Sequence, residues 1–215
     1  MEIKIIERIL AANENAAAEN RELLDHNHVP ALNVMGSPGA GKTSLIERTI
    51  ALLRDRAPVA VIEGDIATTR DAERVAKLGA PVVQIATGGE CHLDAAMVGE
   101  ALANLDLHSA GVVIIENVGN LVCPAEFDLG EHRKVVVASL PEGDDKIEKY
   151  PLIFSIADAV VLNKTDMAGL VDFDIKRFRS ELDAINPKAA FFEVSCRTWH
   201  GLDEWAEWVA PRAVA

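Results

Sequence analysis

Apolar and polar residues follow two different rhythms along the chain. Over residues 3–27 the apolar positions recur at helical spacing, from Ile3 and Ile6 to Leu24, which predicts one long helix. After Pro30, short apolar runs alternate with amphipathic stretches to the end of the sequence. Runs such as 112–115 are apolar throughout, as in central strands covered on both faces. The pattern predicts an α/β fold with a doubly wound, mostly parallel sheet and an N-terminal helix.

The expected elements can be placed from this pattern. Strands are expected at Ala31–Met35, Val59–Glu63, Val82–Ala86, Gly111–Ile115, Lys134–Ser139, Ala159–Leu162 and Phe191–Val194. Helices are expected at 3–27, Lys42–Arg56, Thr69–Leu78, Leu93–Leu105, Ile147–Ile156, Phe173–Ile185 and Leu202–Trp208. We expect residues 1–28 to form a helical arm and residues 29–215 to form a single domain.

Composition narrows the class of protein. With 21 Lys and Arg against 34 Asp and Glu among 215 residues, the net charge is −13, which disfavours a nucleic-acid or anionic-membrane binder. No stretch of the sequence reads as a secretory signal or a membrane-spanning helix. Three cysteines are an odd number, which favours reduced thiols over a disulfide framework. We therefore expect a cytoplasmic protein.

A phosphate-binding loop follows the first expected strand. The segment matches GxxxxGK[ST] between a strand and a helix, where inward-facing backbone N–H groups and the helix N-terminus cradle phosphate. Its lysine supplies a charge for the β- and γ-phosphates, and its threonine hydroxyl is placed to coordinate Mg²⁺. This predicts a P-loop NTPase whose nucleotide-binding residues are Gly36, Ser37, Pro38, Gly39, Ala40, Gly41, Lys42, Thr43 and Ser44.

Acidic residues end two of the expected strands. Glu63 and Asp65 follow one strand, and Glu116 follows another. Each taken alone also fits a helix cap or a solvated turn, but ligands collect beyond the carboxyl ends of parallel strands. We expect Mg²⁺ to be held by Thr43, Asp65 and Glu116, and Glu63 to belong to the nucleotide site. Lys42, Asp65 and Glu116 are the expected catalytic residues, with Asp65 preferred to Glu63 for orienting the attacking water.

The sequence Asn163-Lys164-Thr165-Asp166 follows a later strand and matches NKxD. A carboxylate at its fourth position accepts the N1–H and the 2-amino N–H of guanine, whereas adenine would leave it unpaired. The lysine stem can pack on the base. Ser195 and Cys196 resemble the last GTPase motif, in which a backbone amide meets the guanine O6. The sequence thus predicts GTP and GDP as ligands rather than adenine nucleotides.

Two further loops after strands carry soft metal ligands, namely Cys91 with His92 and, separately, Cys123. Thiolates and an imidazole suit Zn²⁺ or Ni²⁺, but three ligands leave a tetrahedron one short, which a second copy of the chain or a partner would complete. These thiols also fit an alternative reading as small buried hydrophobes, the reading we favour for Cys196. His132 follows Cys123 closely enough to be considered as a further ligand.

With these motifs assembled, the chain resembles the HypB (HypB/HupM) family of GTPases, which help to insert nickel into [NiFe]-hydrogenase. The resemblance covers nearly the whole chain and includes VIEGD, TG-x-x-CHLDA, IENVGNLVCPAEFDLGEH, EGDDK-x-x-KYP and NKTD. The related urease nickel chaperone UreG carries its metal ligands in a Cys-Pro-His triplet, which is absent here.

The resemblance implies a fold of the SIMIBI class of P-loop GTPases and a nucleotide-dependent homodimer. By the same resemblance, Cys91, His92 and Cys123 form a metal site at the dimer interface, and Lys146 reaches the nucleotide across it. The implied partners are the nickel-binding chaperone HypA and the hydrogenase large subunit. Some family members carry an N-terminal cysteine motif or His-rich stretch, and this sequence shows neither, so nickel storage is not expected.

Together these observations predict a GTP-hydrolysing nickel chaperone with slow turnover, because no arginine finger is evident in the motifs. Three alternatives remain at this point. One is a GTP-binding module whose thiols hold structural zinc, and another is a urease-type nickel chaperone. The third is a small-molecule kinase that uses the same loop on ATP, against which the NKTD sequence argues.

Overall fold

The computed structural model describes residues 2–65 and 69–211, and the side chains from residue 10 onward within those ranges. The described residues form one sheet of seven strands in the order β3-β2-β4-β1-β5-β6-β7, and each neighbouring pair is parallel. The strands are β1 (Ala31–Gly36), β2 (Val59–Asp65), β3 (Val82–Ala86), β4 (Val112–Glu116), β5 (Arg133–Ser139), β6 (Ala159–Asn163) and β7 (Ala190–Glu193). The predicted doubly wound α/β fold is confirmed.

The central strands form because their side chains are buried on both faces of the sheet. Every residue of β1, β4 and β6 is buried, as their Val, Ile, Leu and Ala content predicts. The helices that cover them are α1 (Glu2–His26), α2 (Lys42–Leu53), α3 (Arg70–Ala76), α4 (Ala95–Leu102), α5 (Lys146–Lys149), α6 (Pro151–Ser155), α7 (Ile175–Ile185) and α8 (Leu202–Val209). Short 3₁₀ turns lie at Leu107–Ser109, Cys123–Ala125, Leu140–Glu142 and Thr165–Met167.

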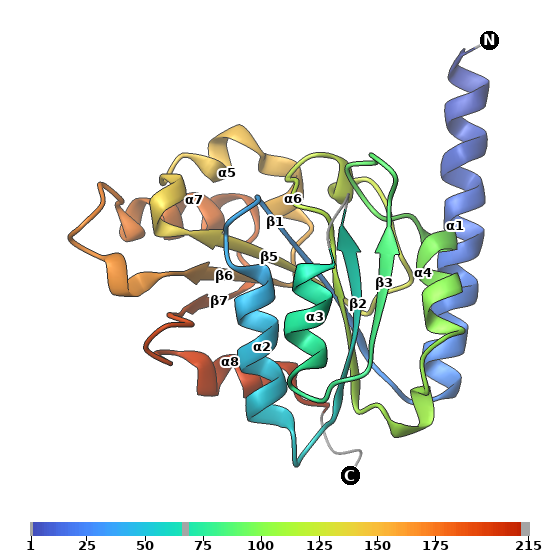
Figure 1. The fold of residues 1–215 in the computed structure, drawn as a ribbon. Coiled ribbons are helices and arrows are strands. Elements are labelled where there is room, and N and C mark those ends of the chain that lie inside the picture. Colours follow the sequence, from blue (N-terminus) through green and yellow to red (C-terminus); the bar gives the residue numbers. More distant parts are fainter. Residues whose placement is uncertain (1, 66–68, 212–215) are drawn as a thin grey trace.

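Two layers of helices enclose the sheet (Figure 1). On one face α2, α3 and α8 bury the alternate strand residues that include Val34, Val61 and Val137. On the other face α1 and α4 cover β2 and β4, while α6 and α7 cover β5 and β6. The connecting loops at the carboxyl ends of the strands are therefore left free to build a site.

The second half of α1 lies against α4 and is fixed by buried asparagines. Asn20 donates from Nδ2 to the carbonyl oxygens of Ala95 and Leu129, at 2.7 and 2.9 Å. Gly130, with φ of 90°, lets the helix approach, because a Cβ there would lie 2.6 Å from the carbonyl oxygen of Ala17. In Figure 1 the first turns of α1 extend past the ends of β2 and β3.

Within the described residues, no helix is long and apolar enough to cross a membrane.

One predicted helix was wrong in detail. The helix expected over 147–156 is two short helices, α5 and α6, that meet at Tyr150 and Pro151. A proline disfavours the helical conformation for the residue before it and lacks the N–H that would continue the helix. The other expected helices and strands are present with ends shifted by a few residues. The division at residue 28 into an arm and a domain stays a prediction.

Candidate nucleotide and metal site

The phosphate-binding loop joins β1 to α2. Gly36, Gly39 and Gly41 have φ values of 155°, 80° and 99°, which glycine adopts readily and other residues rarely. Gly41 also makes a close approach, because a Cβ there would lie 2.3 Å from Nδ2 of Asn163. The loop therefore presses its backbone directly against the segment that carries the NKTD sequence.

Lys42, the first residue of α2, points back into this loop. Its Nζ donates to the carbonyl oxygen of Gly36 at 3.3 Å and lies 4.0 Å from Oε1 of Glu116. Only 7% of Lys42 is exposed. Its charge is thus held where a phosphate in the loop would meet it.

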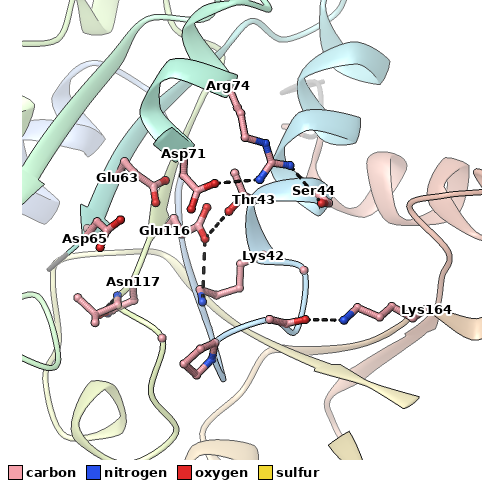
Figure 2. A pocket seen from close by; sticks show the side chains of 16 residues that line it. Lys42, Thr43, Ser44, Glu63, Asp65, Asp71, Arg74, Glu116, Asn117 and Lys164 are labelled. Carbon is pink, nitrogen blue, oxygen red and sulfur yellow. Dashed lines mark hydrogen bonds and ion pairs between the residues drawn. The ribbon is translucent and has the colours of Figure 1, made fainter. Parts of the chain in front are cut away.

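Two carboxyl groups face this lysine from neighbouring strands. Glu63 and Glu116 are register partners in the parallel pair of β2 and β4. Thr43 donates from Oγ1 to Oε1 of Glu116 at 3.0 Å, whereas Oε2 of Glu63 and Oε2 of Glu116 are buried without a hydrogen-bond partner. Figure 2 shows both carboxyl groups beside Thr43 and Lys42. Buried, unpartnered carboxylate oxygens beside a hydroxyl are the donor set that fits Mg²⁺.

Burial sets the protonation of the carboxyl pair. It raises the pKa of Glu63 to about 10, with the charges of Glu116 and Asp71 adding to the effect and that of Lys42 opposing it. Burial also raises the pKa of Glu116, against the charge of Lys42 and the hydrogen bonds from its neighbours. Without a cation, Glu63 is therefore protonated at neutral pH.

These groups line a cavity of about 550 Å³. The lining residues are Pro38, Gly39, Gly41, Lys42, Thr43, Ser44, Glu63, Gly64, Asp65, Asp71, Arg74, Glu116, Asn117, Val118, Gly119 and Lys164. The structure thus brings most of the predicted loop residues together with the predicted acidic residues, including Asp65, whereas Gly36, Ser37 and Ala40 do not line the cavity.

Sequence reasoning missed two charged residues of this cavity, Asp71 and Arg74. Both come from α3, which carries no recognisable motif. The guanidinium of Arg74 donates to Glu47 at 2.7 Å. It also donates to Asp71 at 2.8 Å and to Oγ of Ser44 at 3.3 Å, the two contacts that Figure 2 shows. An arginine therefore stands at the cavity wall, with its charge balanced by two carboxylates.

A second cavity of about 450 Å³ adjoins the first and shares Gly41, Ser44 and Lys164 with it. It is lined by Gly41, Ser44, Glu47, Arg48, Asn163, Lys164, Asp166, Met167, Leu170, Cys196 and Arg197. Lys164 has φ of 62° and donates from Nζ to the carbonyl oxygen of Gly39 at 2.5 Å. The lysine stem therefore spans from the NKTD segment to the phosphate loop.

The remaining residues of the expected base site hold one another in place. Asn163 donates from Nδ2 to the carbonyl oxygen of Ala40 at 3.0 Å and accepts from the Cys196 N–H at 3.4 Å. Ser195 donates from Oγ to Oδ1 of Asp166 at 2.7 Å. Burial raises the pKa of the Cys196 thiol to about 11, which is typical of a packed, unreactive cysteine.

The cysteine and histidine ligands expected from the sequence lie together in the structure. Sγ of Cys91 is 2.9 Å from Sγ of Cys123 and 3.8 Å from Nδ1 of His92. One ligand atom from each of the three residues lies within 4.8 Å of the others. The hydrogen bond with Cys91 and partial burial raise the pKa of the Cys123 thiol. The ring centre of His92 lies 4.1 Å from that of Phe127, with the two ring planes tilted by 34°. This set suits a borderline-soft cation.

Two predicted residues lie elsewhere. His132 is not part of the thiol cluster, because it sits at the amino end of β5, where Nδ1 accepts from the Ala31 N–H and Nε2 contacts Asp25, each at 2.9 Å. Lys146 begins α5 outside both cavities, with Nζ 3.9 Å from Glu142 and 5.7 Å from the ring centre of Tyr150. The role predicted for Lys146, at the nucleotide of a second copy, stays a prediction.

Comparison with known proteins identifies the family. The family described as CobW/HypB/UreG, nucleotide-binding domain, matches residues 30–193. The hydrogenase maturation factor HypB of Azotobacter vinelandii is 50% identical over 207 residues, which cover 96% of this chain and 68% of that protein. The probable hydrogenase maturation factor HypB of Methanocaldococcus jannaschii is 47% identical, over 96% of this chain and 94% of that protein. HypB from Helicobacter pylori in complex with nickel has a TM-score of 0.88 at 38% identity, covering 92% of this chain and 93% of that one. The chain belongs to the HypB family of hydrogenase maturation factors, within the CobW/HypB/UreG group of GTPases.

Proposed function

We propose that this protein is a nickel-binding GTPase that acts as a metallochaperone in the maturation of [NiFe]-hydrogenase. The observation that carries the proposal is the position of Cys123 on the loop that begins directly after Glu116, the last residue of β4 and one of the carboxylates of the phosphate cavity. A nucleotide that binds Glu116 through its cation therefore acts on the same segment that holds a metal ligand. The nickel complex of the Helicobacter pylori relative supports the choice of metal.

The ligand of the two adjoining cavities is GTP or GDP. Phosphates occupy the cavity around Lys42 and the loop amides, and the guanine occupies the cavity around Asp166, whose carboxylate pairs with N1–H and the 2-amino group. The Cys196 N–H and the Lys164 stem complete the base site. Hydrolysis is slow, because the charge of Arg74 is already engaged by Glu47 and Asp71.

Mg²⁺ is held by Thr43, Glu116 and Asp65, with Glu63 close by, and it supplies charge neutralisation to the phosphates. Lys42 binds the phosphate oxygens. Asp65 lies at the end of β2 on the cavity wall, where it orients the water that attacks the γ-phosphate.

Nickel is the cargo of the thiol cluster. Cys91, His92 and Cys123 offer three ligands, so a second copy of the chain completes the coordination and places the metal at a homodimer interface. Lys146, free of both cavities, would reach the nucleotide of the other copy. By family membership, the partners are the chaperone HypA and the hydrogenase large subunit. Two free thiols 2.9 Å apart fit a reducing, cytoplasmic environment.

The carboxyl pair gives a pH-dependent prediction. Because the pKa of Glu63 is about 10 in the folded protein and about 4.3 in an unfolded chain, folding retains a proton between these pH values. The free energy of unfolding then falls as pH rises through this window, by up to about 1.4 kcal/mol per pH unit. Glutamine does not ionise, so in Glu63→Gln the free energy of unfolding does not fall in this way as pH rises. Without Mg²⁺ and nucleotide, we expect its melting temperature to exceed that of the wild type by more at pH 9 than at pH 6.

Thermal unfolding followed by circular dichroism measures this difference. Glu14→Gln, on the exposed face of α1, is the matched control and should follow the wild type at every pH. An equal offset between Glu63→Gln and the wild type at both pH values would show that Glu63 is ionised in the folded protein.

The base site gives a second prediction. Asp166→Asn replaces a carboxylate that accepts two hydrogen bonds with an amide that also donates, so it mismatches guanine and matches the 2-oxo group of xanthine. We expect GTP affinity to fall on the order of 100-fold or more and XTP affinity to rise. Fluorescent-nucleotide titration measures both. Asp183→Asn, on the exposed face of α7, is the control. A normal GTP affinity in Asp166→Asn would rule out this base site.

The nickel proposal is tested by titrating the purified protein with Ni²⁺ and recording thiolate-to-nickel charge-transfer absorbance. The titration is run with GDP and with a non-hydrolysable GTP analogue. We expect a signal that depends on the nucleotide and is lost in Cys123→Ala, because that variant removes one of three ligands. Cys196→Ala, which changes a buried thiol outside the cluster, should keep the signal.

Two results would contradict the proposal. A nickel signal that is the same in Cys123→Ala would remove the cluster from metal binding. Stoichiometric zinc that resists chelators and is needed for folding would instead make the cluster a structural site.

A further inference from the structure

The loops that carry the metal ligands are joined by the side chain of Asn117. This residue follows Glu116 at the end of β4 and is 1% exposed. Its Oδ1 accepts from the N–H of Leu93 at 3.1 Å and from the N–H of Val118 at 3.0 Å. Leu93 directly follows His92, so one amide group connects the loop of Glu116 and Cys123 to the loop of Cys91 and His92.

The same residue belongs to the wall of the nucleotide cavity. Asn117, Val118 and Gly119 line that cavity together with Glu116, and Figure 2 labels Asn117 among its lining side chains. A phosphate or cation that moves this stretch of chain therefore moves the acceptor of the Leu93 hydrogen bond. This movement reaches Cys123 along the chain, and it reaches His92 through the hydrogen bond between Asn117 and Leu93.

The opposite end of the amide is anchored in the core. Nδ2 of Asn117 donates to Oδ1 of Asn33 at 3.2 Å, and Asn33, which is fully buried in β1, donates to Oε1 of Glu131 at 3.2 Å. The backbone N–H of Asn117 also donates to the carbonyl oxygen of Val34 at 3.0 Å. Because each lost hydrogen bond would leave a buried polar group unpaired, Asn117 can change position only between a few fully hydrogen-bonded arrangements.

A second side-chain contact joins the metal loops, from Asn120, whose backbone bridges to Gly36 of the phosphate loop. Asn120 donates from Nδ2 to the carbonyl oxygen of Cys91 at 3.4 Å and accepts at Oδ1 from the Val122 N–H at 2.9 Å. It lies three residues beyond Asn117 on the same loop but does not line the cavity. The side chain of Asn120 thus only holds the two metal loops together. The side chain of Asn117 holds them together and also connects them to the nucleotide cavity.

We infer that Asn117 is a positioning residue that transmits the nucleotide state to the metal ligands, so that both ligand loops change position as one unit. The inference rests on the proposed function, because it specifies how GTP regulates the nickel site. Asn117 contacts neither the metal nor the reacting phosphate in this role; it acts through Glu116 on one side and through Leu93 on the other.

The test compares Asn117→Ala with Asn120→Ala in the protein of residues 1–215. Ni²⁺ affinity is measured by competition with a chelator, at saturating Mg²⁺ with GDP and again with a non-hydrolysable GTP analogue. The quantity of interest is the ratio of the two nickel affinities. We expect this ratio to differ from 1 by about 5-fold or more in the wild type and to fall within about 2-fold of 1 in Asn117→Ala. Asn120→Ala should weaken nickel binding in both states and keep the wild-type ratio.

A second measurement covers the case in which Asn117→Ala does not fold. Hydrogen exchange of the peptide spanning residues 89–95 is followed in the wild type and in the milder Asn117→Ser. We expect the GTP analogue to change exchange in this peptide severalfold in the wild type and not in Asn117→Ser.

The outcomes separate this inference from the proposed function. A wild-type ratio that survives in the Asn117 variants overturns the inference and leaves the nickel GTPase in place, as does exchange that responds to nucleotide in Asn117→Ser. A wild-type ratio of 1 also overturns it. Nickel binding that is absent from the wild type, or unaffected by Cys123→Ala, overturns the proposed function together with the inference.

Discussion

Parallel pairing of β4 between β1 and β2 is the constraint on which the site depends. Because the three strands run in one direction, the phosphate loop after β1, the acidic end of β2 and the loop after β4 emerge at one edge of the sheet. The register sets Glu63 beside Glu116 and Glu116 beside Val34. A shift of one residue would turn these carboxyl groups to the other face of the sheet.

This arrangement places charge where water cannot compensate it. Two carboxyl groups share a buried corner with one lysine, and burial keeps the pKa of Glu63 high. The divalent cation and phosphate proposed for this cavity would compensate these buried groups. The three thiols also differ in their burial. Cys196 is packed into the core, whereas Cys91 and Cys123 are half-buried and face each other, so that a ligand can reach them.

Much of the fold and of the candidate site could be predicted, because the residues of each binding motif are close together in the sequence. The P-loop, the NKTD segment and the Cys91-His92 pair each lie within a few consecutive residues, and apolar runs such as Val112–Ile115 indicate buried strands. Their placement at one sheet edge follows from a parallel sheet. Most of the residues so predicted line the two cavities or form the thiol cluster, whereas Gly36, Ser37, Ala40, Lys146 and Ser195 line neither cavity.

The rest depends on contacts between distant segments. Arg74 reaches the cavity from a helix with no motif, and Asn117 matters only through Leu93 and Asn33, 24 and 84 residues away. Nearness in sequence suggested His132 as a metal ligand, because it follows Cys123 closely. The chain between them returns to the amino ends of the strands, so His132 lies beside Ala31, directly before β5. A single polar residue in an apolar context gives no sign of its partners until the fold is known.

If nucleotide and nickel bind two ends of one connected segment, their affinities must be linked equally in both directions. The most direct measurement is therefore calorimetric titration of the wild type with a non-hydrolysable GTP analogue and with GDP, each with and without saturating Ni²⁺. The preference for the analogue over GDP should change on nickel binding by the same factor by which the analogue changes nickel affinity relative to GDP. A preference that nickel leaves unchanged, although nickel is bound through Cys123, would show two independent sites and contradict the coupling.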